Sequence, residues 1–186
     1  MSLAHQNAAC EQTFAGDRIG APSLFAPQIA PEPRTARAFF AWLYDDGAGY
    51  IEIVAGRTNP TDPRKIDLVT TTRRWCYYDP ERPDLLQAAA AYAAQLADGY
   101  GNVYCSVRLY TADAKRTNTR AEKYTKPSCV IFIDDAPAAP ALPYSLSVRT
   151  SEHSRHAYYK CDAATSKEDA RRAAVALGGD PSGGDL

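Results

Sequence analysis

Several common functional signatures are missing from this 186-residue chain. Its five cysteines form no C-x-x-C pair, which argues against a structural zinc site and against a disulfide framework. No glycine-rich phosphate-binding loop of either common spacing is present. The apolar runs all fall short of a membrane span, and the first residues lack the basic and apolar regions of a signal peptide. We therefore expect a cytoplasmic protein with no membrane partner.

An excess of one charge sign is also missing, since 21 basic side chains are balanced by 22 acidic ones. Local charge is less even. One segment collects basic residues with only Asp113 and Glu122 in opposition; its members are Arg108, Lys115, Arg116, Arg120, Lys123 and Lys126. Such a cluster can bind a phosphate backbone, and a solvated loop explains it equally well.

The hydrophobic pattern predicts one α+β domain over 34–186, after an irregular, proline-rich leader over 1–33. The polar stretch 111–126 is expected to be a long loop, and the segments 66–72 and 75–78 can form one strand with a break. The expected helices are 35–43, 85–96 and 165–177, and the expected strands are 50–54, 66–72, 75–78, 102–110, 128–133, 144–150 and 155–161. This order favours a mostly antiparallel sheet with helices packed on one side.

The central stretch is Ser128–Ile133, an apolar run that predicts a buried strand and leads directly into Asp134 and Asp135. Carboxylates at the end of a strand lie where a sheet meets solvent, which is a usual place for catalytic groups or hard-metal ligands. The simpler alternative is that the two residues open the turn at Ala136-Pro137, because Asp is a common turn residue.

Two further sets of polar residues follow this strand. The segment 150–160 contains Ser154, Arg155 and His156, and Asp180 and Asp185 come after the last expected helix. Carboxylates from different elements, with His and Arg nearby, suit a divalent-metal site for phosphoryl transfer. Each set also has a structural explanation, since a lone His is usually solvated and Asp before Pro is a common turn pair.

The order and spacing of these sets resemble the RepB-like branch of the archaeo-eukaryotic primase and primase-polymerase superfamily, over roughly residues 85–186. The resemblance lies in Gly101–Tyr104, Ile133–Ala136, Leu142–Ser145, Thr150-Ser151 with Ser154–Lys160, Leu177–Asp180 and Gly184–Leu186. It implies an RRM-like catalytic sheet with a smaller N-terminal α/β unit. It also implies a DNA primase or polymerase of plasmid, phage or mobile-element replication, which joins nucleoside triphosphates on a single-stranded DNA template with Mg²⁺ or Mn²⁺.

Carried over by position, the resemblance assigns roles to particular residues. Asp134, Asp135 and Asp180 would be catalytic and hold metal, with Asp185 a competing third acid. Ser154-Arg155-His156 looks like the Ser-x-His motif that holds the nucleotide's phosphates. Independently of the resemblance, the basic segment is expected to contact the template phosphates, through Arg108, Lys115, Arg116 and Arg120.

The chain departs from the family pattern at two places. Phe132 stands where the first acid of the acid-x-acid motif is expected, so the metal pair would be Asp134 and Asp135 or one ligand would be lost. The chain also stops at Leu186, before the family's basic Arg-x-Pro-Gly-like segment. We therefore expect either a truncated piece of a longer replication protein, in which a C-terminal helicase domain often follows, or a degenerate copy. Two alternatives stay open: an inactive RRM-like nucleic-acid-binding domain, and an unrelated α+β domain in which Asp134, His156 and Asp180 lie far apart.

Overall fold

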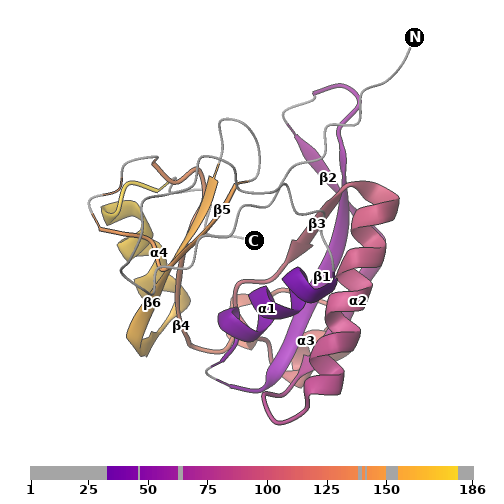
Figure 1. Ribbon diagram of the computed structural model, residues 1–186, viewed down its shortest axis with the longest axis horizontal. Coiled ribbons are helices and arrows are strands. Elements are labelled where there is room, and N and C mark those ends of the chain that lie inside the picture. Colours follow the sequence, from indigo (N-terminus) through magenta and orange to yellow (C-terminus); the bar gives the residue numbers. More distant parts are fainter. Residues whose placement is uncertain are drawn as a thin grey trace. The chain divides into compact units, whose positions relative to one another are not determined.

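A computed structural model describes residues 33–45, 47–62, 65–137, 140, 142–149 and 155–179 of the chain (Figure 1). These residues form an α+β protein with four α-helices and two three-stranded antiparallel sheets. The predicted α+β class is confirmed, and the strands are divided between two sheets. The predicted leader lies outside the described residues, apart from Pro33. No helix in the described ranges combines the length and apolar character needed to cross a membrane.

The described chain divides into two compact units. One comprises residues 33–130 with 163–167, and the other comprises residues 131–162 with 168–179. The boundary falls inside two strands, so neither unit is a single continuous segment of the sequence.

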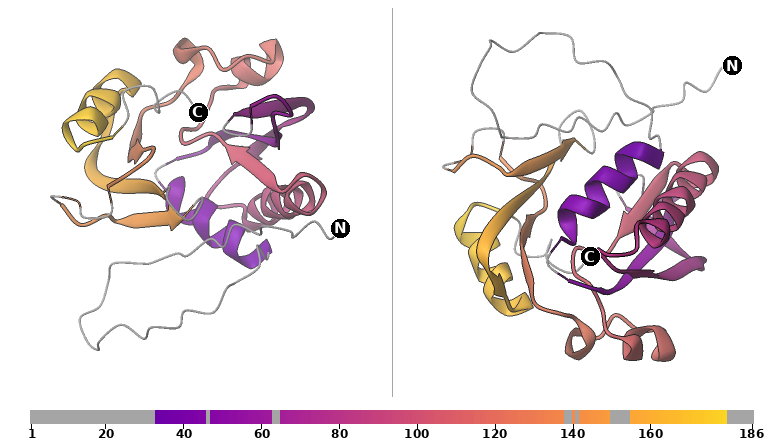
Figure 2. Two further views of the ribbon diagram at one scale, coloured as in Figure 1. Left: turned by 90° about the horizontal axis from the view of Figure 1, so that it is seen from above. Right: turned by 60° about the horizontal axis from the view of Figure 1, so that its bottom comes forward.

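The N-terminal unit is built on a sheet of strand order β2-β1-β3. Helix α2 packs on all three strands and on α1 (Figures 1 and 2). Ile51 and Ile53 of the central strand are fully buried. The elements of this unit are α1 (Pro33–Leu43), β1 (Gly49–Thr58), β2 (Ile66–Tyr78), α2 (Pro83–Tyr100), β3 (Asn102–Cys105), α3 (Ala112–Thr117) and the 3₁₀-helix η1 (Glu122–Tyr124).

Strand β2 is one strand with an irregularity at the break that the sequence predicts. Its register against β1 shifts between the pairs Ile53–Arg74 and Ala55–Val69. The Thr72 hydroxyl closes the irregularity by accepting the Ala55 N–H at 2.9 Å and donating to the Val69 carbonyl at 2.8 Å. A bulge of this kind bends its strand and changes the direction of nearby side chains.

Three predictions of secondary structure in this unit are wrong. The predicted strand 102–110 ends at Cys105, and its last residue, Tyr110, makes only isolated bridges. The predicted loop 111–126 contains α3 and η1. Helix α2 continues past Gly99 because the left-handed residue that ends it is Gly101, at φ 81°.

The C-terminal unit has the strand order β4-β6-β5 and one helix. Its core lies between α4 and one face of the sheet, where Ile131, Ile133 and Tyr159 pack against Ala170 and Ala174. Since successive strand residues point to opposite faces, Phe132 and His156 lie on the other face. The elements are β4 (Ser128–Ile133), β5 (Leu146–Arg149), β6 (Arg155–Thr165) and α4 (Lys167–Ala176).

Candidate functional site

The ends of two strands of the C-terminal unit position Asp134 and His156. Strand β4 ends at Ile133, and the chain turns through Asp134 and Asp135, the latter left-handed at φ 47°. Strand β6 begins at Arg155, and its second residue is His156, which is opposite Val148 of β5. The Ala136 N–H donates to the Arg155 carbonyl at 2.8 Å, which holds the turn against the start of β6.

Asp134 and His156 are joined by a direct hydrogen bond. His156 Nε2 lies 3.0 Å from Asp134 Oδ1, and the Asp135 N–H donates to the same oxygen at 3.0 Å. The hydrogen bond from His156 lowers the pKa of the Asp134 carboxyl from its ordinary value. The two side chains are 22% and 30% exposed, so the pair is accessible to a ligand. The separation expected of an unrelated α+β domain is therefore not found for this pair.

An aromatic pair borders the site on the same face of the sheet. The ring of Phe132 lies edge-on to His156, with centroids 5.1 Å apart, and 5.3 Å from Tyr158. Phe132 thus places a ring beside His156, at the position where the resemblance calls for a second carboxylate. An apolar ring cannot ligate a metal, so the acids that remain for this motif are Asp134 and Asp135.

These two carboxylates suit a hard cation in part. Because β4 ends before Asp134, the strict alternation of strand side chains no longer applies to the pair. Asp134 is half-buried and Asp135 is exposed. Across the described ranges, no group of three or more His, Cys, Asp or Glu side chains comes together as a metal site. Mg²⁺ is commonly held by one or two carboxylates together with substrate phosphates, and the metal role of Asp134 and Asp135 stays a prediction.

The other predicted site residues divide into two groups. Arg155 is half-buried at the first position of β6. Ser154, Asp180 and Asp185 lie outside the described residues, so their predicted roles stay predictions.

The four predicted DNA-binding residues have different surroundings. Arg108 is buried, and its guanidinium donates to the Thr165 carbonyl at 2.7 Å and to the Ser166 carbonyl at 3.1 Å. This gives Arg108 a structural role that does not require DNA. The remaining three lie in or next to α3 and are at least partly exposed: Lys115, Arg116 and Arg120.

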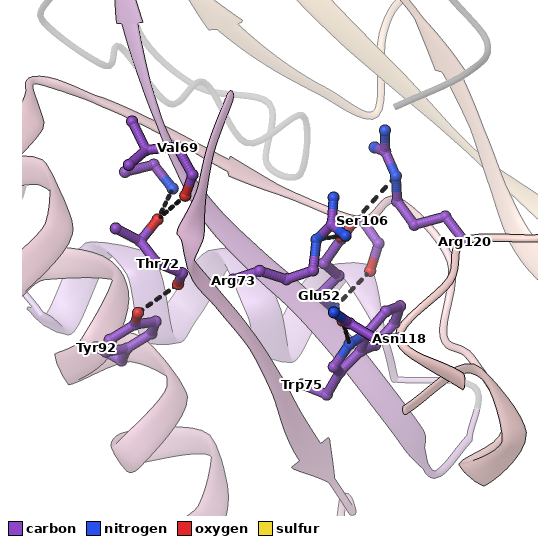
Figure 3. Close-up of polar contacts among 10 residues, drawn as sticks. Glu52, Val69, Thr72, Arg73, Trp75, Tyr92, Ser106, Asn118 and Arg120 are labelled. Atoms are coloured by element: carbon purple, nitrogen blue, oxygen red, sulfur yellow. Dashed lines mark hydrogen bonds and ion pairs between the residues drawn. The ribbon is translucent and has the colours of Figure 1, made fainter. Parts of the chain in front are cut away.

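A buried carboxylate in the N-terminal unit was not predicted from the sequence. Glu52 of β1 is 2% exposed and pairs with Arg73 of β2, at 2.7 Å between Nε and Oε1, and with Arg120, at 3.5 Å (Figure 3). The Arg73 contact is an ion pair in which the Nε–H does not point along the line to the oxygen. Burial raises the pKa of Glu52, against the opposing effect of the two guanidinium groups. The sequence does contain a signal for this buried carboxylate, because Glu52 is a charged residue within the apolar run Ile51–Val54.

Comparisons of the chain with protein-family models, with curated proteins and with solved structures find no match. The functional interpretation therefore depends on the motifs and on the geometry of the two units.

Proposed function

We propose that the chain is a primase-polymerase domain that joins nucleotides on a single-stranded DNA template. The observation that supports this proposal is the direct contact between Asp134 and His156, two residues that the motifs select independently and that are 3.0 Å apart. The RRM-like character of the C-terminal sheet is part of the same proposal.

The proposed reaction is attack of a nucleic-acid 3′-hydroxyl oxygen on the α-phosphorus of a nucleoside triphosphate. A new P–O bond forms to that oxygen, the bond to the bridging oxygen of the β-phosphate breaks, pyrophosphate leaves, and the hydroxyl proton passes to solvent. Asp134 and Asp135 would hold Mg²⁺ or Mn²⁺, which supplies electrostatic stabilisation of the phosphate oxygens.

His156 and Arg155 would hold the triphosphate through charge-assisted hydrogen bonds. In the absence of substrate, His156 Nε2 is bonded to Asp134. We assign the same nitrogen to the triphosphate. Triphosphate and Asp134 therefore compete for one hydrogen. Without substrate, the hydrogen bond between His156 and Asp134 holds both side chains in place, at the end of β4 and the start of β6.

The test is primer synthesis and primer extension on single-stranded DNA with Mn²⁺, using Asp134→Asn and His156→Ala. We expect each variant to lose about 100-fold or more in incorporation rate, as for removal of a group that stabilises charge in a transition state. Asp162→Asn is the matched control, because Asp162 is an exposed carboxylate of β6, the strand that contains His156. Full incorporation by Asp134→Asn would disprove the proposal.

A second candidate is an inactive nucleic-acid-binding domain, and Phe132 is the observation that favours it. Its ring lies against His156 on the side where the motif places an acid. Under this alternative the wild-type protein binds single-stranded DNA in a salt-dependent manner and incorporates no nucleotide with either metal ion. The same assay therefore distinguishes the two candidates.

A further inference from the structure

One face of the N-terminal sheet collects aromatic side chains. Tyr50 is paired with Tyr77, and two residues further along Glu52 is paired with Trp75, so alternation places all four on the same face. Helix α2 covers the opposite face, as shown by Arg74, which is paired with Ile53 and lies over the ring of Tyr92 from α2. The aromatic face is thus the one that α2 leaves uncovered.

The rings of this face form two contacting pairs. The centroids of Tyr50 and Tyr77 are 5.2 Å apart, and those of Trp75 and Tyr110 are 5.3 Å apart. Tyr77 is 42% exposed, Tyr50 and Trp75 are half-buried, and Tyr110 is buried. Exposed aromatic faces of this kind offer stacking area.

Positive charge accompanies the rings. Lys115 of α3 is exposed, and its Nζ lies 5.0 Å from the centroid of the Tyr50 ring. On the same face, Arg73 and Arg120 both pair with Glu52 through Nε (Figure 3), and two guanidinium groups against one carboxylate leave a net positive charge. The face is therefore both aromatic and cationic.

The segment that supplies Lys115 is fixed to this face. The Trp75 indole N–H donates to Asn118 Oδ1 at 2.9 Å, directly after α3 (Figure 3). The Tyr110 N–H and carbonyl exchange hydrogen bonds of 2.9 Å with Tyr50 just before α3. The position of Lys115 over Tyr50 is thus set by contacts on both sides of its helix.

We propose that this aromatic and basic surface, made of Tyr50, Trp75, Tyr77 and Lys115, binds single-stranded nucleic acid by base stacking. Unpaired bases stack on aromatic faces whatever their sequence, while nearby cations neutralise the backbone phosphates. Bases within a duplex are already stacked on each other, so the surface favours the single strand. The proposal rests on the proposed function and deepens it, since it names where the template strand is held, on the unit that does not contain Asp134 and His156.

The test measures the binding of a fluorescein-labelled oligo(dT) of about 15 nucleotides to the full chain by anisotropy. EDTA is present and nucleotide is absent, so that catalysis plays no part. We expect Tyr77→Leu to weaken binding by about 5-fold or more, the loss typical of one stacked base. Lys115→Gln should reduce the slope of log affinity against log salt by about 0.7, the value for one phosphate of a single strand.

The chain offers a matched control on the other face of the same sheet. Arg57 of β1 lies 4.8 Å from the ring centroid of Tyr100 at the end of α2, which is a cation and tyrosine pair of the same kind. Tyr100→Leu and Arg57→Gln should bind the oligonucleotide within about 2-fold of wild type. Thermal unfolding of each variant verifies that it is folded.

Several results would overturn the inference. These are an unchanged affinity in Tyr77→Leu, equal competition by a duplex of the same length, or no binding of oligo(dT) at low salt. Its failure is distinguishable from failure of the proposed function. Binding that depends on Tyr77, without any nucleotide incorporation, would support the stacking surface and contradict the polymerase function. Incorporation that depends on Asp134, with binding indifferent to Tyr77, would do the reverse.

Discussion

The carboxyl of Asp134 owes its lowered pKa first to the hydrogen bond from His156. Because the folded-state pKa lies below that of the unfolded chain, ionised Asp134 stabilises the fold. This stabilisation is fully present above the unfolded-state pKa and is lost as the pH falls through the folded-state pKa. The pair therefore contributes to stability at neutral pH and ceases to do so in the acid range, below about pH 4.

We predict that His156→Ala raises the pKa of Asp134, as measured by carbon-detected NMR titration of the side-chain carboxyl. The same variant should lose part of the dependence of unfolding free energy on pH in the acid range. Asp162→Asn is the control, because it should leave the titration of Asp134 as it is in wild type. An Asp134 titration that is identical in His156→Ala and in wild type would show that the hydrogen bond does not set this pKa.

The contact between Asp134 and His156 was predictable at this scale because both belong to local motifs at the ends of apolar strands. The site around Glu52 was not, because its partners Arg73 and Arg120 are distant in the sequence and meet it only through the fold. Phe132 was recognised as a departure from the motif. Its edge-on packing against His156 depends on the pairing of β4 with β6, which no local pattern specifies.

Among the elements, α3 shows how composition can hide a helix. Its polar, basic residues predicted a loop, yet Asp113 lies in the first turn and Lys115 and Arg116 lie in the last, as the helix dipole favours. Asn118 ends the helix in the left-handed conformation at φ 49°, and its side chain accepts the hydrogen bond from Trp75. One residue thus terminates α3 and attaches it to the sheet.

We predict that Asn118→Ala destabilises α3 more than Asn118→Gly does. Both variants lose the Trp75 hydrogen bond, and only alanine adds the cost of a left-handed residue, about 1 kcal/mol. Hydrogen exchange of the amides of 114–119 measures the effect, with the amides of α2 as an internal reference. Equal protection in the two variants would mean that the backbone conformation of Asn118 does not limit this helix.

At the scale of the whole molecule, Arg108 attaches a segment from late in the sequence to the N-terminal unit. Residues 163–167 belong to that unit, and Arg108 donates to the carbonyls of Thr165 and Ser166 within it. The Thr165 hydroxyl also donates to the Ser128 carbonyl at 3.1 Å. Because residues 163–167 come late in the sequence, the N-terminal unit can be completed only after most of the chain has been synthesised.

We predict that Arg108→Gln lowers the free energy of unfolding by about 2 kcal/mol, since two part-buried hydrogen bonds from a buried charged donor are lost. Urea denaturation measures the change, and Arg116→Gln is the control, because Arg116 is exposed and paired only at the surface with Asp113. Oligo(dT) affinity should stay close to wild type in Arg108→Gln. A variant of unchanged stability and weakened binding would return Arg108 to the DNA-binding set.

The α+β class was predictable because helical and strand periodicities occur in distinct segments. The division into two sheets was not, since it depends on β3 pairing with β1 through four registered residue pairs, Ile53–Cys105, Val54–Tyr104, Ala55–Val103 and Gly56–Asn102. Gly56 permits this arrangement, because a Cβ there would lie 2.5 Å from Ile66 Cγ2 and 2.7 Å from Tyr104 Cε2. Such a close approach is visible only once the strands have been placed.

The position of β2 at an edge of the N-terminal sheet has a consequence for the behaviour of the chain at high concentration. A 13-residue edge strand offers unpaired backbone groups to a second copy of itself, which is a common origin of aggregation. The adjacent arginines Arg73 and Arg74 lie close to the middle of this strand. An antiparallel copy centred there would bring like charges together on both faces. The two arginines thus also help to keep the edge of the sheet from self-association.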